Sequence, residues 1–177
     1  MEPVPDREEG RAGVSPAEKE AETAETLSFV IFRLGAEWFA LPTQVVREVT
    51  DVRAIHRVPQ RSASVLLGLV NLRGELQLCV SLNALLGLDS EDVQSRTTDL
   101  RRVKRLVVVE KEGDRWVFPV AEVREVFHCT PDDVQETPTA PAPTTAPYVR
   151  GVIKWMEKQV GQLDETWLFD TLKRRIS

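Results

Sequence analysis

Side chains that could perform catalysis or bind a metal are few in this 177-residue chain and are spread along it. The two cysteines, Cys79 and Cys129, have no CxxC spacing, and the two histidines, His56 and His128, are each isolated. Residues at these separations do not form a zinc-binding pattern. The motifs G-x-S-x-G and H-E-x-x-H and the phosphate-binding P-loop are absent from the sequence. The sequence therefore predicts a protein that is not an enzyme and has no metal or other cofactor.

The net charge of −5 is concentrated at the N-terminus. Residues 1–26 hold eight acidic and three basic residues, and the remainder of the chain is neutral. This segment has no aromatic and few large aliphatic side chains, so it cannot bury enough apolar surface to offset the entropy of ordering it. We expect a disordered acidic tail over residues 1–27 and a folded unit over residues 28–177. Because the folded part carries no net positive charge, no nucleic-acid partner is expected.

Apolar runs in the sequence are short. None reaches the roughly 18 residues that a membrane helix needs, and the acidic N-terminus lacks the apolar stretch of a secretory signal. We therefore expect no direct membrane insertion and a cytoplasmic location, where both thiols stay reduced.

The folded part reads mainly as short β-strands joined by turns. Residues 75–82 alternate polar and apolar side chains, as a half-buried strand does, and a glycine ends a short helix over residues 83–87. Residues 137–147 are rich in proline, which has no N–H to donate to a sheet, so an extended surface loop is expected. Residues 27–41 and 105–120 each have the pattern of a β-hairpin.

An internal repeat divides the folded part into two halves. The motif Leu-Pro-x3-Val-Arg-Glu-Val at residues 41–49 recurs as Phe-Pro-x3-Val-Arg-Glu-Val at residues 118–126, with an offset of 77. Arg73-Gly74 recurs as Arg150-Gly151 with the same offset. Near the C-terminus the best match has an offset of 83, which predicts an insertion of about six residues after Gly151.

Each half holds some five short strands, too few for a stable core of its own. Packing two curved sheets together, or curling each into a barrel, buries one face of every strand. The predicted fold class is therefore mainly β, with two small subdomains related by duplication and a few short helices.

Four segments of the folded part carry a recognisable pattern. They are Phe29-x-Ile-Phe-x-Leu-Gly35, Phe39-Ala-Leu-Pro42, Val46-Arg-Glu-Val49 and Gly68-Leu-Val-Asn-Leu-Arg-Gly74. Together they resemble the CheW family of chemotaxis coupling proteins. The resemblance spans residues 28–172, and Gly-x-x-Asn-x-Arg-Gly before an apolar strand is its most specific part. It implies two five-stranded SH3-like β-barrels around a shared core.

The resemblance also implies a function. Proteins of this family are adaptors that link the cytoplasmic tip of methyl-accepting chemotaxis receptors to the regulatory domain of a CheA-type histidine kinase, at membrane-associated arrays. Two alternatives stay open: a divergent member that binds only the receptor or only the kinase in a non-flagellar pathway, and a small β-barrel module that binds a ligand.

The resemblance assigns roles to particular residues, each with a structural alternative. Arg73 is the predicted receptor contact, because an arginine in a turn can bind a carboxylate or the carbonyls at a helix end, although it can also bind nearby loop carbonyls. Glu48 is either a kinase contact or half of a surface charge pair. The full assignment is Arg73, Val46, Val70 and Asn71 for the receptor, Glu48 and Val49 for the kinase, and Gly68, Gly74 and Gly151 for structural turns. Val46 and Val70 are expected to line a groove between the two halves, and the alternative for both is core packing. The alternative for Asn71 is a structural role in shaping its turn.

Overall fold

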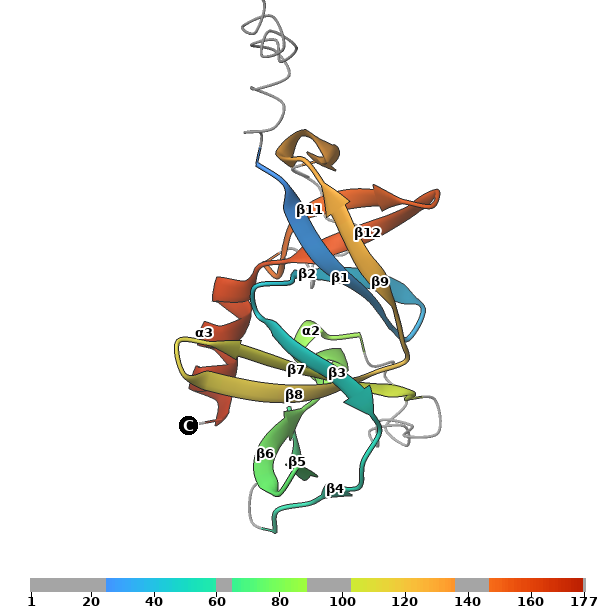
Figure 1. Cartoon of the computed structure of the whole chain (residues 1–177). Helices are drawn as coiled ribbons and strands as arrows, with labels where there is room; N and C mark the ends of the chain where they lie inside the picture. Colours follow the sequence, from blue (N-terminus) through green and yellow to red (C-terminus); the bar gives the residue numbers. More distant parts are fainter. Residues whose placement is uncertain (1–24, 60–64, 89–102, 136–146, 177) are drawn as a thin grey trace, which may run out of the picture.

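Two six-stranded β-sheets make up most of the computed structural model, which describes residues 25–59, 65–88, 103–135 and 147–176 (Figure 1). Sheet A has the order β10-β11-β12-β2-β1-β9, with β1 Leu27–Leu34, β2 Glu37–Pro42, β9 Glu122–Cys129, β10 Val134–Gln135, β11 Val149–Trp155 and β12 Lys158–Leu163. Sheet B has the order β3-β7-β8-β6-β5-β4, with β3 Val46–Asp51, β4 Ile55–His56, β5 Leu66–Leu72, β6 Glu75–Val80, β7 Arg105–Lys111 and β8 Asp114–Val120.

The helical elements are short and lie beside the sheets. They are α2 Leu82–Leu86, the 3-10 turn η3 Pro131–Asp133 and α3 Glu165–Ile176. No helix in the described ranges is long and apolar enough to cross a bilayer. The predicted acidic tail, apart from its last residues, and nearly all of the predicted proline-rich loop lie outside the described residues.

The mainly β fold with two duplicated subdomains is confirmed, but each sheet has six strands because a two-residue strand, β4 or β10, adds an edge.

The repeats also exchange their first hairpins. The β1–β2 hairpin of the first repeat lies inside sheet A, between β9 and β12 of the second repeat, and β7–β8 lies inside sheet B, between β3 and β6. Each exchanged hairpin makes one parallel pairing, β2 with β12 and β8 with β6. Neither repeat therefore contains a complete sheet.

The pairing of Arg73-Gly74 with Arg150-Gly151 across the repeats is wrong. Arg150 and Gly151 lie inside β11, so Gly151 is not a turn residue, and the hairpin tip that corresponds to Arg73-Gly74 is Met156-Glu157. The register break at Leu66/Gly68 in β5 recurs at Val149/Gly151 in β11, which makes Gly151 the counterpart of Gly68. The extra residues therefore precede β11 rather than follow Gly151.

Gly68 and Gly151 share one steric role. A Cβ on Gly68 would lie 2.2 Å from the backbone oxygen of His56 in β4, and a Cβ on Gly151 would lie 2.8 Å from Val134 Cγ1 in β10. Gly68 also has φ +149°, a conformation open only to glycine. Both glycines thus let a two-residue edge strand lie close to its neighbour.

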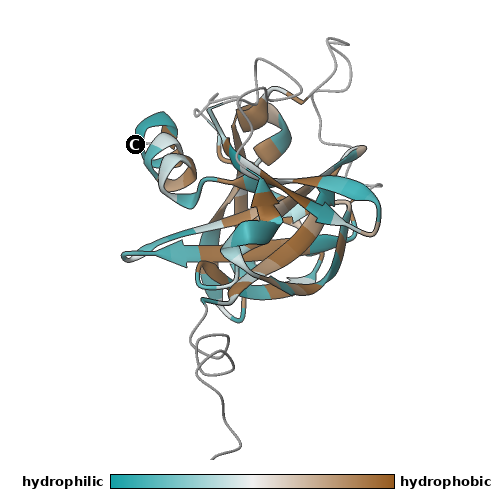
Figure 2. Cartoon of the chain, turned by 90° about the horizontal axis from the view of Figure 1, so that it is seen from above, coloured by the Kyte–Doolittle hydropathy of each residue, from teal (hydrophilic) through white to brown (hydrophobic). Residues whose placement is uncertain are grey.

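The main core lies between the two sheets and under α3. It gathers apolar side chains from both repeats, and the hydropathy colours of Figure 2 show apolar residues concentrated within the strand layers. Two equivalent caps begin the helices: Ser81 Oγ accepts from Ala84 N at 3.1 Å, and Asp164 Oδ1 accepts from Trp167 N at 3.1 Å. The fully buried members include Phe32, Leu41, Val80, Phe118, Leu163, Leu168 and Leu172.

Candidate functional site

Arg73 lies at the tip of the β5–β6 hairpin and projects into solvent. Arg73 has φ 55° and Gly74 has φ 86°, the two left-handed positions of a tight hairpin turn. The Asn71 side-chain oxygen accepts from Gly74 N at 2.8 Å, so Asn71 closes this turn. The Arg73 side chain is 81% exposed, and its Nη2 lies 3.2 Å from Oε1 of Glu48. The structure thus brings together Arg73, predicted for the receptor, and Glu48, predicted for the kinase.

Glu48 comes from β3, an edge strand of sheet B. Burial alternates along β3, with Val46 half-buried against the main core and Val49 39% exposed. Val46 and Val49 lie across from residues of the main core, and Glu48 lies across from Val108 of a smaller apolar core of sheet B. Glu48 therefore faces the side of β3 opposite to the two valines, and it contacts Arg73. We call Arg73 and Glu48 the β3 surface.

Val70 does not belong to this surface. It lies in β5 and is fully buried with Cys79, Leu106, Val108 and Val117 in the small core of sheet B. The expectation that Val70 lines an open groove is corrected here, because a side chain without exposed area offers no contact to a partner. Val70 anchors β5, the strand that leads through Asn71 to Arg73, in this small core.

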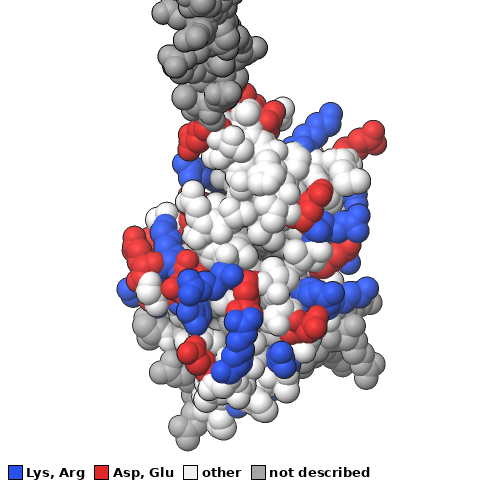
Figure 3. Space-filling view, in the orientation of Figure 1, with Lys and Arg blue, Asp and Glu red and all other residues white. Residues whose placement is uncertain are grey.

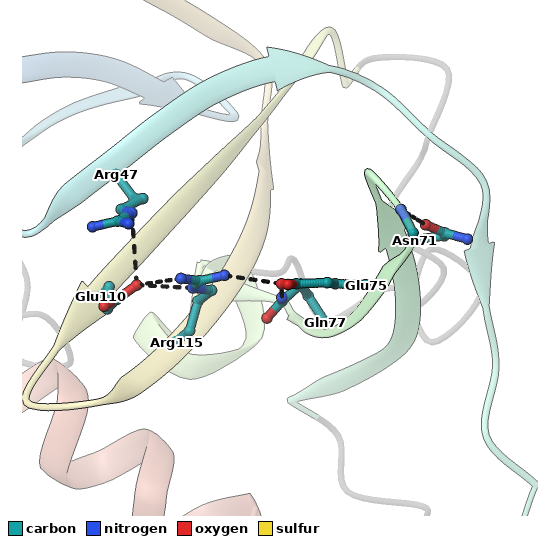
Figure 4. Close-up of polar contacts among 7 residues, drawn as sticks. Arg47, Asn71, Glu75, Gln77, Glu110 and Arg115 are labelled. Atoms are coloured by element: carbon teal, nitrogen blue, oxygen red, sulfur yellow. Dashed lines mark hydrogen bonds and ion pairs between the residues drawn. The ribbon is translucent and has the colours of Figure 1, made fainter.

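A charged network that the sequence did not predict continues from the β3 surface across sheet B (Figure 4). Glu110 Oε2 accepts from Arg115 Nη2 at 2.6 Å and lies 3.8 Å from Arg47 Nε. Arg115 Nη1 lies 3.4 Å from Glu75 Oε2, which also accepts from Gln77 Nε2 at 3.2 Å. Cations and carboxylates thus alternate from β3 through β7 and β8 to β6. Figure 3 shows this mixture of blue and red on the sheet B half, next to a broad area without charged side chains.

The hydrogen bonds of this network shift two pKa values. The pKa of Glu110 is lowered, chiefly because Arg115 donates to its carboxylate, and the same contact raises the pKa of Arg115. Both groups therefore remain charged across the physiological range.

We expect the Glu110 carboxylate to titrate below the ordinary value of 4.5 in the native protein, and the Arg115→Met variant to move this pKa back upward. A carboxyl pKa that is lowered in the folded state stabilises the fold at any pH above the pKa of the unfolded state. This stabilisation is lost as the pH falls through the pKa of the folded state. A side-chain carboxyl NMR titration measures both midpoints. Equal pKa values in the native protein and in Arg115→Met would contradict the assignment.

The repeated Glu of the Val-Arg-Glu-Val motif has the same task in both sheets. Glu48 binds Arg73 from the β5–β6 tip, and Glu125 accepts from Trp155 Nε1, at the end of β11, at 2.7 Å. In sheet A, Glu125 therefore binds the indole of Trp155, which is 4% exposed. In sheet B, Glu48 binds the exposed guanidinium of Arg73. The two copies therefore differ in the residue that binds the Glu, which is exposed and charged in sheet B and buried and neutral in sheet A.

The buried cysteine thiols are poorly suited to covalent chemistry. Burial raises the pKa of the Cys79 thiol to about 12, so the reactive thiolate is not formed at neutral pH. Within the described ranges, no group of three or more His, Cys, Asp or Glu residues is arranged to hold a metal ion.

The known proteins that this chain resembles are chemotaxis proteins. The sequence model of the CheW-like domain matches residues 28–172. The chain is 27% identical over 124 residues to chemotaxis protein CheW of Helicobacter pylori, covering 70% of each protein. It is 24% identical over 147 residues to chemotaxis protein CheW of Treponema pallidum, covering 83% of this chain and 84% of that protein.

A solved structure shares the fold. The scaffolding protein TtCheW of Thermoanaerobacter tengcongensis superposes with a TM-score of 0.64 at 23% identity, over 79% of this chain and 90% of that one. The match of the domain model extends over nearly all of the folded part. The chain therefore belongs to the CheW-like family of chemotaxis scaffold proteins, which are not enzymes.

Proposed function

We propose that this chain is an adaptor that couples methyl-accepting chemotaxis receptors to a CheA-type histidine kinase, in the cytoplasm at membrane-associated receptor arrays. The observation that supports this most is the β3 surface, where an exposed arginine and a carboxylate lie 3.2 Å apart on sheet B. Such a pair suits protein recognition, since both groups can form directional, charge-assisted hydrogen bonds with a partner.

The receptor contact in this proposal is Arg73. Its backbone is held at a hairpin tip by a turn that Asn71 and Gly74 close, while its guanidinium remains in solvent. An arginine placed in this way can donate two parallel hydrogen bonds to a carboxylate on a receptor helix. Val46, also predicted for the receptor, faces the opposite side of β3 and packs against the main core, so it would support the strand rather than contact the same helix.

The kinase contact in this proposal is formed by Glu48 and Val49. Val49 is 39% exposed on an edge strand, and Glu48 is partly neutralised by Arg73 at 3.2 Å. A receptor carboxylate that binds Arg73 would compete with Glu48 and leave it free for a kinase cation. Receptor and kinase binding would then be energetically coupled, and the coupling would act equally in both directions.

The effect on the kinase is thermodynamic. Binding both partners holds the kinase at the receptor, and a change in receptor state shifts the kinase equilibrium through contacts that differ between its conformations. Modest affinity at each contact is sufficient, because an array presents many copies of each partner.

The Arg73→Glu variant tests the proposal. We expect it to lower receptor-dependent autophosphorylation of the kinase at least about tenfold, because it replaces an attraction with a repulsion at the contact. Stability should change by only about 0–1 kcal/mol, since the pair with Glu48 is at the surface. The measurement combines the purified chain, a receptor cytoplasmic fragment and the kinase from the same source.

Arg105→Glu is the matched control. Arg105 is also an exposed cation of sheet B paired with a carboxylate, Asp51 at 3.3 Å, and the substitution changes the charge equally. It should leave coupling within about twofold of the wild type. If Arg73→Glu and Arg105→Glu activate the kinase equally, Arg73 is not a contact. If the wild type binds the kinase without responding to the receptor, the chain is a single-partner member of the family.

A further inference from the structure

Three exposed cations lie around β4, the outer strand of sheet B, and the segment that leads into it from β3. Arg53 lies two residues before β4, and Arg57 directly follows it. Lys104 directly precedes Arg105, the first residue of β7, which pairs with the last residue of β3. None of the three cations forms an ion pair with any described residue. We call Arg53, Arg57 and Lys104 the basic edge.

The charge of the basic edge is not offset by its neighbours. β5, which pairs with β4, has no charged residue. The carboxylates at the nearby ends of β3 and β6 are each bound to a cation outside the basic edge. These ion pairs are Asp51 with Arg105 at 3.3 Å, Glu48 with Arg73 at 3.2 Å and Glu75 with Arg115 at 3.4 Å. The three cations of the basic edge therefore remain available to an anion from another source.

The duplication shows that this positive charge is particular to sheet B. Because Gly68 is the counterpart of Gly151, β4 corresponds to β10, and Arg53 corresponds to Asp132. The described residues around β10 include two acids and two bases, so that edge of sheet A has no excess of charge. They are Asp132, Asp133, Arg150 and Lys154. An anionic segment would therefore prefer the edge of sheet B.

The chain itself supplies an anionic segment. Residues 1–26 hold eight acidic and three basic residues, and nearly all of them lie outside the described residues. The segment leads into β1, which begins at the far end of sheet A, whereas β4 lies at the opposite end of the molecule (Figure 1). Glu22 and Glu25, the last acids of the segment, are therefore held far from the basic edge of the same copy. The basic edge of a second copy has no such restriction.

We propose that the basic edge binds the acidic segment, residues 1–26, of a second copy of this chain. Carboxylates of the segment would accept hydrogen bonds from Arg53, Arg57 and Lys104, and Val52, 38% exposed beside Arg53, would add an apolar contact. Exposed ion pairs are individually weak and screened by salt, so binding depends on several of them at once. The contact joins two different surfaces, so copies would associate head to tail. It involves this chain alone and does not depend on the function proposed for the β3 surface.

The test mixes two full-length forms of the chain. One copy is labelled with ¹⁵N, and the other is unlabelled and carries a nitroxide at Ser15→Cys. Both native cysteines are buried, so the nitroxide attaches at residue 15. In about 20 mM salt we expect paramagnetic broadening of the amides of residues 52–58 in the ¹⁵N copy. Raising the salt to about 0.5 M should remove the broadening, because exposed charges are then screened.

Variants of either surface should weaken the broadening. Arg53→Glu with Arg57→Glu in the ¹⁵N copy should lower it at least about fivefold, since an attraction becomes a repulsion. Arg150→Glu with Lys154→Glu makes the same charge change at exposed cations of sheet A, and this matched control should stay within about twofold.

A variant of the acidic segment tests the proposal without altering either sheet. Four substitutions in the nitroxide copy neutralise acids that all precede β1. They should lower the broadening at least about fivefold, even if the arginine variant fails to fold. The substitutions are Glu18→Gln, Glu20→Gln, Glu22→Gln and Glu25→Gln.

Three results would overturn the proposal. The first is a mixed sample in which residues 52–58 are not broadened more than the rest of the surface. The second is broadening that high salt leaves unchanged, or that the arginine variant and its matched control lower equally. The third is broadening that occurs only when one copy carries both labels, which would place the acidic segment on its own copy.

Discussion

Cut between residues 96 and 97, the chain should give two fragments that are each unfolded alone and that fold when mixed. Each sheet needs strands from both fragments. Without β1 and β2, sheet A loses its centre, because β9 pairs with β1 and β12 pairs with β2. Without β7 and β8, sheet B loses its centre in the same way. The main core, drawn from both repeats, would be open in either fragment.

Circular dichroism and ¹H–¹⁵N correlation spectra of each fragment and of their equimolar mixture measure this. We expect narrow amide dispersion for each fragment and a spectrum close to that of the intact chain for the mixture. Adding one fragment to the intact chain is the control and should change nothing. A dispersed spectrum and a cooperative unfolding transition for either fragment alone would show that one repeat completes its own sheet.

Gly68→Ala should be the most damaging single substitution among the glycines of the hairpins. Its methyl group would lie 2.2 Å from the His56 oxygen, and φ +149° is strained for alanine. We expect a loss of about 3–5 kcal/mol, because β4 must detach from β5 to make room. Urea unfolding followed by tryptophan fluorescence measures this loss.

Gly74→Ala is the matched control for steric space. Gly74 also has a positive φ, +86°, but a Cβ there would meet nothing within 4 Å. Its cost should be about 1 kcal/mol, from backbone conformation alone. Similar losses for the two variants would mean that the contact with β4 does not require a glycine at position 68.

Local patterns predicted the strands well. The hairpins over residues 27–41 and 105–120 and the half-buried strand at 75–82 are present, because alternation and turn residues act over a few positions. The exchange of hairpins was not predictable in this way. Both repeats have the same strand pattern, so nothing local distinguishes pairing within a repeat from pairing between repeats.

The error with Arg150 and Gly151 has a similar origin. A two-residue match can occur by chance, and the true counterpart of Arg73-Gly74, Met156-Glu157, shares its backbone conformation but not its residue types. The two hairpin tips share a positive φ at both residues rather than the same residue types.

The candidate site was predicted in its parts but not in its connections. Arg73 and Glu48 were each singled out, and the structure adds the ion pair between them. The network of Arg47, Glu110 and Arg115 was missed, because its members look like ordinary surface charges until β3, β7 and β8 place them side by side. Val70 was misplaced because a buried and a groove-lining valine have the same sequence signal.

The adaptor proposal rests on one chain binding two partners at once, and sedimentation of the kinase with receptor assemblies measures this. At fixed receptor and kinase concentrations, increasing amounts of the chain should first raise the pelleted kinase and then lower it. Excess adaptor occupies receptor and kinase separately, so the amount bridged passes through a maximum. Arg73→Glu should flatten this curve, and Arg105→Glu should not. Kinase that stays in the supernatant at every concentration of the chain, although the chain itself pellets with the receptor, would contradict the coupling of receptor to kinase.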